Sequence, residues 1–139
     1  MRKGAPVDHE AVAAVCREFD LVLALLFGSR SQGRERADSD SDLAVLQRAG
    51  VVPAGRFLEL GFRLGEATGL PDVDLVDLRR AAPLLRHQAA SHGTSLYEAE
   101  PGRFNLFRVE AWRLWLDDAL TLRRLDVRYV RESLDRLRT

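Results

Sequence analysis

The sequence predicts an α/β domain in which a small mixed sheet is flanked by helices and followed by a helical C-terminal extension. The chain has 139 residues, a typical length for one domain with its own core. Residues 21–27 form an unbroken apolar run that ends at Gly28, as expected for a strand buried on both faces. Strand-like and helical segments alternate along the chain, and this alternation favours a sheet covered by helices.

The first half of the chain predicts two helices and two strands. Asp8 is placed to cap a helix that runs to about residue 19. The buried strand at 21–27 follows, and a second apolar strand occupies 43–46 after a polar, glycine-containing stretch. Pro53 can open a helix that runs to about residue 68, because its fixed backbone angle suits the first turn.

The second half predicts two further strands and two helical regions. Residues 72–78 alternate carboxylate and apolar side chains and predict a strand. A helix over 81–91 and a short edge strand over 94–98 follow. A long helical region then occupies about 103–137, with a candidate break near Asp126. We therefore expect one domain over residues 1–139, with a core at about 8–98.

Composition excludes several classes of protein. Hydrophobic residues make up 46% and charged residues 30%, which is unlike a disordered or fibrous chain. Lys+Arg and Asp+Glu each number 21, so the net charge gives no general affinity for nucleic acid or an anionic membrane. Lys3 is the only lysine. Any phosphate must therefore be held by arginine, hydroxyl or backbone amide groups.

The number of cysteines and the length of the longest apolar run indicate in which cellular compartment we expect the protein. Cys16 stands alone, so no intrachain disulfide can form, and its apolar neighbours predict a small buried side chain. One cysteine and three scattered histidines give no zinc cluster. The longest apolar run is far shorter than the roughly 20 residues that span a bilayer. No signal peptide is recognisable, and we expect a cytoplasmic protein without membrane contact.

Two polar features stand at the ends of neighbouring predicted strands. Gly28 and Ser29 stand at the exit of the first strand, and Asp40 and Asp42 stand at the entrance of the second. Side chains two apart on a strand point to one face, so the two carboxylates project together and repel unless a cation lies between them. A hard divalent ion such as Mg²⁺ prefers such oxygen ligands. Asp74, with apolar neighbours, is the expected third ligand.

The other half of this site is expected to hold phosphate. Glycine lets a backbone approach a ligand closely, and a hydroxyl with free amides suits phosphate oxygens. The Ser29 hydroxyl can contact phosphate or cap a following helix. The Arg30 guanidinium can bind a triphosphate or lie on the surface. Asp72 and Asp77 compete with Asp74 for the third metal position, although Asp77 should point to the opposite face. A phosphate cradle beside three carboxylates suits two-metal phosphoryl or nucleotidyl transfer.

These motifs resemble a known family. Gly28-Ser29, ten intervening residues, the Asp40-x-Asp42 pair and a downstream Asp74 resemble the minimal nucleotidyltransferases of the DNA polymerase beta-like superfamily. The stretches LFGSRSQGRERADSDSDLAVL and VDLVDLRRAAPLLR carry the likeness, which spans roughly residues 10–130. The resemblance implies the polymerase beta-like fold and transfer of AMP from ATP with two Mg²⁺ ions. Asp40, Asp42 and Asp74 would be catalytic metal ligands, and Gly28, Ser29 and Arg30 would bind nucleotide.

The resemblance also implies a partner. Small members of this family are antitoxins paired with HEPN-domain toxins, and some transfer AMP to a tyrosine hydroxyl of the toxin. Two alternatives remain: an antitoxin that neutralises by binding alone, and a transferase that modifies a small molecule such as an antibiotic. No lysine lies near the motifs, a departure that leaves triphosphate binding to arginines.

The apolar pattern of the C-terminal region admits two interpretations. Only 41 residues follow residue 98, enough for one helical hairpin, so we expect another chain to present the acceptor. Between 104 and 122, apolar side chains cover about two thirds of the helix circumference, more than one buried face requires. Either the C-terminal segment folds back over this helix, or a surface near Trp112 or Trp115 docks a partner or a second copy.

Overall fold

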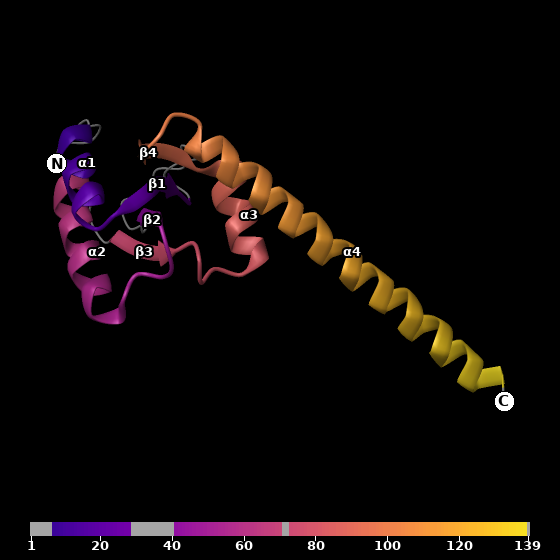
Figure 1. Cartoon of the computed structure of the whole chain (residues 1–139). Coiled ribbons are helices and arrows are strands. Elements are labelled where there is room, and N and C mark those ends of the chain that lie inside the picture. The colour runs from indigo at the N-terminus through magenta and orange to yellow at the C-terminus, as the bar shows by residue number, and fades with distance from the viewer. Residues whose placement is uncertain (1–6, 29–40, 71–72, 139) are drawn as a thin grey trace.

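A computed structural model describes residues 7–28, 41–70 and 73–138 of the chain (Figure 1). These residues form helices and strands that alternate in the order expected for an α/β fold. The elements are α1 (His9–Glu18), β1 (Leu21–Phe27), β2 (Ser41–Gln47), α2 (Ala54–Thr68), β3 (Val73–Asp77), α3 (Pro83–His92), β4 (Thr94–Glu98) and α4 (Arg103–Arg138).

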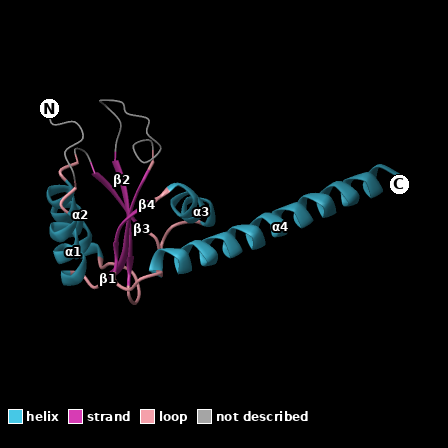
Figure 2. Cartoon of the chain, turned by 90° about the horizontal axis from the view of Figure 1, so that it is seen from above, coloured by secondary structure: helices cyan, strands magenta, loops and turns pink. Residues whose placement is uncertain are grey.

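The four strands form one mixed sheet in the order β3-β2-β1-β4. β1 pairs antiparallel with both β2 and β4, while β2 and β3 run parallel. α1 and α2 cover one face of the sheet, and α3 with the first part of α4 lies on the other (Figure 2). The sheet between two helical layers confirms the predicted fold class, and β4 is an edge strand as predicted.

Local signals in the sequence fix the helix ends. The carboxylate of Asp8 accepts a hydrogen bond from the N–H of Ala11 at 3.1 Å, which satisfies one of the free amides at the start of α1. Pro53 directly precedes α2, and Gly69, with a φ of 69°, ends it. Pro83 occupies the first position of α3, so this helix begins two residues later than the sequence predicted.

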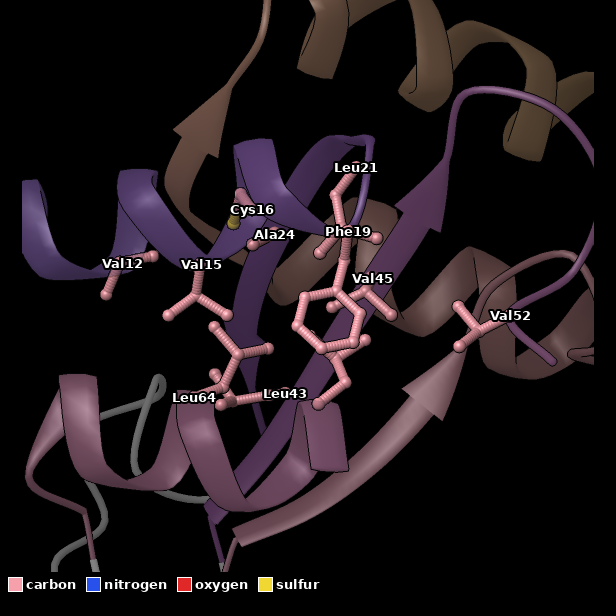
Figure 3. Close-up of a cluster of buried hydrophobic side chains, with 11 residues drawn as sticks. Val12, Val15, Cys16, Phe19, Leu21, Ala24, Leu43, Val45, Val52 and Leu64 are labelled. Carbon is pink, nitrogen blue, oxygen red and sulfur yellow. The ribbon is translucent and has the colours of Figure 1, made fainter. Parts of the chain in front are cut away.

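Apolar side chains pack on both faces of the sheet. β1 contributes to both clusters because every residue on it except Leu26 is buried, as its unbroken apolar run predicted. Cys16 is fully buried, which confirms its prediction as a small core residue. The cluster beneath α1 and α2 comprises Val12, Val15, Cys16, Phe19, Leu21, Ala24, Leu43, Val45, Val52, Leu60 and Leu64 (Figure 3). The cluster on the other face comprises Val22, Leu23, Leu25, Phe27, Ala44, Leu46, Leu78, Ala89, Ala90, Phe107 and Ala111.

The C-terminal region differs from the sequence predictions in two ways: its helix is not broken, and its last part does not fold back over the first. α4 is one unbroken helix of 36 residues, so the expected break near Asp126 is wrong. Residues 103–138 contain neither glycine nor proline, the two residues that most readily interrupt a helix. Only the beginning of α4 packs on the domain, and the rest projects away from it (Figure 2). No helix within the described ranges combines the length and apolarity needed to cross a bilayer.

Candidate active site

The parallel pairing of β2 and β3 brings two predicted metal ligands together. Asp42 on β2 is the register partner of Asp74 on β3. Partners in a parallel pair project from the same face, which here is the face that carries Ala44 and Val76 toward α3 and α4. Asp74 is exposed and Asp42 is partly exposed, so both carboxylates are within reach of a ligand from solvent.

Gly28 lies against one of these carboxylates. The antiparallel register pairs Phe27 with Asp42, and Gly28 is the next residue along β1. The φ angle of Gly28 is 98°, a backbone conformation that residues with a β-carbon rarely adopt. A β-carbon built on Gly28 would lie 2.5 Å from Oδ2 of Asp42. The predicted phosphate-binding turn and the predicted metal ligand therefore lie close together, and a side chain at position 28 would require the Asp42 carboxylate to move.

The remaining predicted site residues lie outside the described residues. Asp40, Ser29 and Arg30 all fall within residues 29–40. Their roles as metal ligand, phosphate-contacting hydroxyl and triphosphate-binding cation therefore remain predictions. Asp72, which competed with Asp74 as third ligand, also lies outside the described residues.

Asp77 has a structural position, on the face opposite to the pair, as predicted. Its carboxylate is buried and accepts hydrogen bonds from the backbone N–H of Val52 at 2.8 Å and of Arg79 at 3.0 Å. These bonds hold the segment between β2 and α2 against the end of β3. A carboxylate committed to two backbone donors is unsuited to the third metal position, which leaves Asp74 as the better candidate.

The donor chemistry of the pair fits a divalent cation. Asp42 and Asp74 both offer carboxylate oxygens, the ligands that Mg²⁺ prefers. Like charges directly opposite on neighbouring strands destabilise a sheet, and a cation between them would remove that cost. Among the described side chains, no group of three or more His, Cys, Asp or Glu is placed to hold a metal ion. The predicted three-carboxylate set therefore depends on Asp40.

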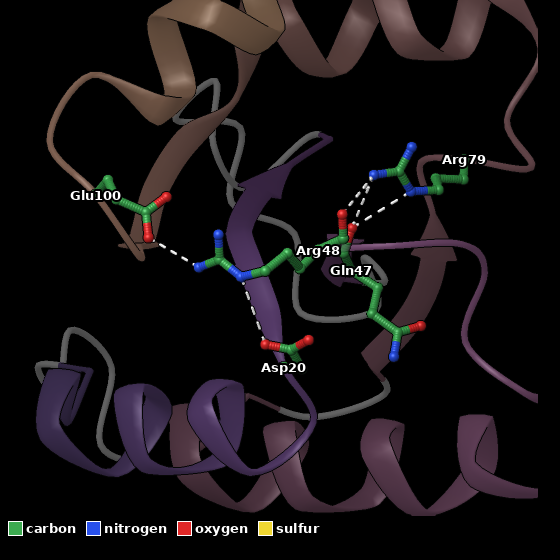
Figure 4. A network of polar contacts seen from close by, with 5 residues as sticks. All are labelled: Asp20, Gln47, Arg48, Arg79 and Glu100. Carbon is green, nitrogen blue, oxygen red and sulfur yellow. Dashed lines mark hydrogen bonds and ion pairs between the residues drawn. The ribbon is translucent and has the colours of Figure 1, made fainter.

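Arginines secure the end of the sheet opposite to this pair (Figure 4). Arg48 follows β2 and forms ion pairs with Glu100 at 2.8 Å and with Asp20 at 3.6 Å. The guanidinium of Arg79 donates to the backbone oxygens of Gln47 and Arg48 at 3.0 and 3.1 Å. These contacts tie β2 to the segments after β3 and β4, so both arginines are structural groups remote from the candidate site.

A pocket that the sequence analysis missed lies beside β3, an edge strand of the sheet. It has a volume of about 420 Å³ and is mostly apolar, with Asp77 and Arg80 as its charged residues. The pocket was not predictable because its walls come from α2, β3 and α3, which only the fold brings together. Its lining is completed by Val52, Ala54, Phe57, Leu75, Val76, Ala81 and Leu85.

The two tryptophans of α4 have different surroundings. The ring of Trp115 stacks on His87 of α3 with 4.9 Å between ring centroids, so it contributes to the contact between these helices. Trp112 is 43% exposed, and its Nε1 donates to Oγ of Ser91 at 3.3 Å. The predicted alternative in which the C-terminal segment covers this helix is wrong, because that segment continues α4 outward.

Comparison with known proteins identifies similar sequences. The family model described as Polymerase beta, Nucleotidyltransferase matches residues 10–101. Over 77 residues the chain is 43% identical to the protein adenylyltransferase MntA of Shewanella oneidensis. That match covers 55% of this chain and 54% of the relative, so it spans about half the length of MntA.

Solved structures resemble the fold over most of its length. A chain in the crystal structure of a toxin–antitoxin with AMP-PNP is 31% identical, with a TM-score of 0.69 over 88% of this chain and 98% of that one. A second similar chain comes from a tri-AMPylated Shewanella oneidensis HEPN toxin in complex with its MNT antitoxin. It is 29% identical, with a TM-score of 0.63 over 88% of this chain and 95% of that one.

Proposed function

Because the chain belongs to the polymerase beta nucleotidyltransferase family, we propose that it is an antitoxin that transfers AMP from ATP to its toxin. The observation that carries this proposal is the register pairing of Asp42 with Asp74 beside the side-chain-free turn at Gly28. In this proposal residues 8–98 form the catalytic core of a single domain and α4 extends it.

In the proposed reaction, the protein positions two reactants around its carboxylates. Asp40, Asp42 and Asp74 would hold two Mg²⁺ ions, which neutralise charge on the reacting oxygens. Gly28, Ser29 and Arg30 would bind the triphosphate, the glycine by leaving its backbone open to close approach. The acceptor hydroxyl gives up its proton to solvent, its oxygen bonds to the α-phosphorus of ATP, and the bond between that phosphorus and the leaving pyrophosphate breaks.

The proposed acceptor is a tyrosine hydroxyl on a HEPN-domain toxin. The exposure of Asp74 supports a large acceptor, because a side chain presented by another protein can reach this edge of the sheet. Similar chains occur with a tri-AMPylated HEPN toxin and with AMP-PNP, which supports both the partner and the nucleotide. The basic tail of α4 is available to steer an acidic partner.

Labelled ATP tests this proposal directly. We expect the protein, with Mg²⁺ and the cognate HEPN toxin, to transfer label to a toxin tyrosine that mass spectrometry identifies. Asp42→Asn and Asp74→Asn should each reduce the transfer rate by about a hundredfold or more, because a metal ligand is lost. Asp135→Asn, which changes an exposed carboxylate far along α4, is the matched control. Full transfer by Asp42→Asn would overturn the catalytic proposal.

The same variants separate the two alternatives. If Asp42→Asn protects cells from the toxin as well as the wild-type protein does, neutralisation proceeds by binding alone. If label appears on a small hydroxyl compound in the absence of any protein acceptor, the protein is a small-molecule transferase. Loss of protection together with loss of tyrosine labelling supports the proposed protein adenylyltransferase.

A further inference from the structure

An apolar stripe runs along the part of α4 that projects from the domain. We call it the α4 seam: Leu116, Leu120, Val127, Val130, Leu134 and Leu137. Each of these side chains is between 49% and 83% exposed. They recur at steps of three and four residues, with one seven-residue step across position 123, which is arginine. This is the a/d spacing of a helix that packs against another helix in a coiled coil.

The α4 seam faces away from its own domain. Trp112 donates a hydrogen bond to Ser91 of α3. The other α4 side chains that pack on the domain include Phe107 and Ala111, which are buried, and Trp115, which stacks on His87. In the heptad that places Leu116 at d and Leu120 at a, these three residues occupy positions b, f and c. Positions b, c and f lie on the side opposite to a and d. The domain therefore leaves the seam uncovered along the projecting helix.

The projecting part of α4 lacks the packing on an apolar face that stabilises most helices in proteins. An isolated helix gains little stability in water, and most helical stability in proteins comes from packing of an apolar face. The C-terminal part of α4 extends away from the sheet in both views (Figures 1 and 2). Packing on a second helix would bury the seam and supply the missing stabilisation.

We propose that the α4 seam pairs with the same seam of a second copy of this chain, in antiparallel orientation. The charges beside the seam support this occupant. The e positions, which follow each d position, hold Glu110 and Asp117 in the first half of the helix and arginines at 124, 131 and 138 in the second. In an antiparallel pair, e positions of the two helices lie beside each other. Within the overlapping part of the two helices, this places an acidic e position of one helix beside a basic e position of the other.

One register satisfies the apolar positions and pairs Asp117 with Arg131, and it places position 124, an arginine, beside position 124 of the partner near the two-fold axis. With the two-fold axis at residue 125, Leu116 packs against Leu134 of the partner subunit and Leu120 packs against the partner subunit's Val130. Asp117 then faces the partner's Arg131. By symmetry each contact occurs twice, as in any isologous interface. The overlap begins at about residue 113, close to Trp115, which packs on α3.

A parallel pair fits the sequence less well. Arg113 occupies an a position, and in a parallel pair it would lie directly beside its own copy. Arginine also occupies position 123, a d position, with the same consequence. Facing like charges in the seam are destabilising, whereas the antiparallel register places each of these positions opposite an apolar residue.

The test is a charge exchange across the proposed interface, read as dimer dissociation by analytical ultracentrifugation of the full chain without nucleotide or toxin. We expect the wild-type protein to dimerise. D117R and R131E alone should each weaken the dimer by roughly tenfold or more, because each places like charges opposite one another twice. The double variant D117R/R131E should restore dimerisation, because it re-creates both opposite-charge pairs with the signs exchanged.

Matched controls lie on the other side of the same helix. Glu132→Arg and Arg128→Glu make equal charge changes at exposed f and b positions, and should leave the dimer unchanged. L134Q should weaken the dimer without lowering the thermal unfolding midpoint of the sheet domain. A monomeric wild-type protein, equal effects of controls and seam variants, or no rescue in the double variant would each overturn the proposal. A monomer whose seam variants lose only toxin binding assigns the seam to the toxin instead.

The dimer proposal stands apart from the proposed function. The dimer is measured without ATP, metal or acceptor, so loss of AMP transfer in Asp42→Asn leaves this measurement untouched. Conversely, a monomeric protein can still transfer AMP. A negative result in the dimer measurement therefore does not contradict the proposed AMP transfer, and a negative result in the transfer assay does not contradict the dimer.

Discussion

The β-carbon that Gly28 lacks would lie 2.5 Å from Oδ2 of Asp42. This contact joins the end of β1 to the start of β2, and it links the turn expected to hold phosphate with a carboxylate expected to hold metal. No real β-carbon tolerates a separation that short, so any other residue at position 28 must displace Asp42. Gly28 is therefore required for the geometry of the site as well as for its backbone angle of 98°.

Gly28→Ala should inactivate the protein more than it destabilises it. The positive φ costs alanine about 1–2 kcal/mol of folding free energy. The displaced Asp42 should lower the AMP-transfer rate by about a hundredfold, because small misplacements of catalytic groups have large effects. Gly50→Ala is the matched control, since Gly50 has a φ of 77° but an added β-carbon there would meet no other segment within 4 Å. Equal transfer rates in the two variants would contradict this account.

Asp77→Asn should destabilise the fold. The buried carboxylate of Asp77 accepts from Val52 and Arg79, and an amide offers only one oxygen to these two donors. We expect the free energy of unfolding to fall by about 1–3 kcal/mol in urea titrations. Asp74→Asn, at an exposed position, should change it by less than about 0.5 kcal/mol. The opposite ranking would show that Asp77 does not hold the segment after β2.

Alkaline pH should reveal the burial of Cys16. Burial raises the pKa of this thiol from 9.0 to about 12. Between these values the unfolded chain loses a proton that the folded chain keeps, so stability is full below pH 9 and falls as pH rises toward 12. Burial also raises the pKa of Tyr97, so the wild-type protein is compared with Cys16→Ala. Urea titrations from pH 8 to 10.5 should show a shallower decline in the variant, and equal slopes would contradict the assignment.

Nucleotide and metal should stabilise the protein together. If AMP-PNP and Mg²⁺ bind at Asp42 and Asp74, a ligand concentration a hundred times the dissociation constant adds about 2.7 kcal/mol of stability. Thermal unfolding should therefore shift upward with both present. EDTA, or the Asp42→Asn substitution, should remove most of that shift. A shift that survives both treatments would place the nucleotide away from the carboxylate pair.

Elements with strong local patterns were predictable from the sequence. The unbroken apolar run of β1, the cap at Asp8 and the proline at 53 act within a few residues, so their consequences can be derived without tertiary structure. The spacing of Gly28, Asp42 and Asp74 indicated a site for the same reason. The expected break near Asp126 was wrong because charged residues are tolerated along an exposed helix and neither glycine nor proline is present to end it.

By itself, the sequence determined the helices and strands, the lone buried thiol and the residue types of the candidate site, since these depend on side-chain chemistry and short-range periodicity. Only the tertiary structure decided that β3 pairs parallel to β2, which sets Asp42 beside Asp74, and that Asp77 accepts a hydrogen bond from Val52. It also decided that α4 leaves the domain with its apolar seam uncovered. These outcomes depend on contacts between distant segments, whose free energies no local pattern encodes.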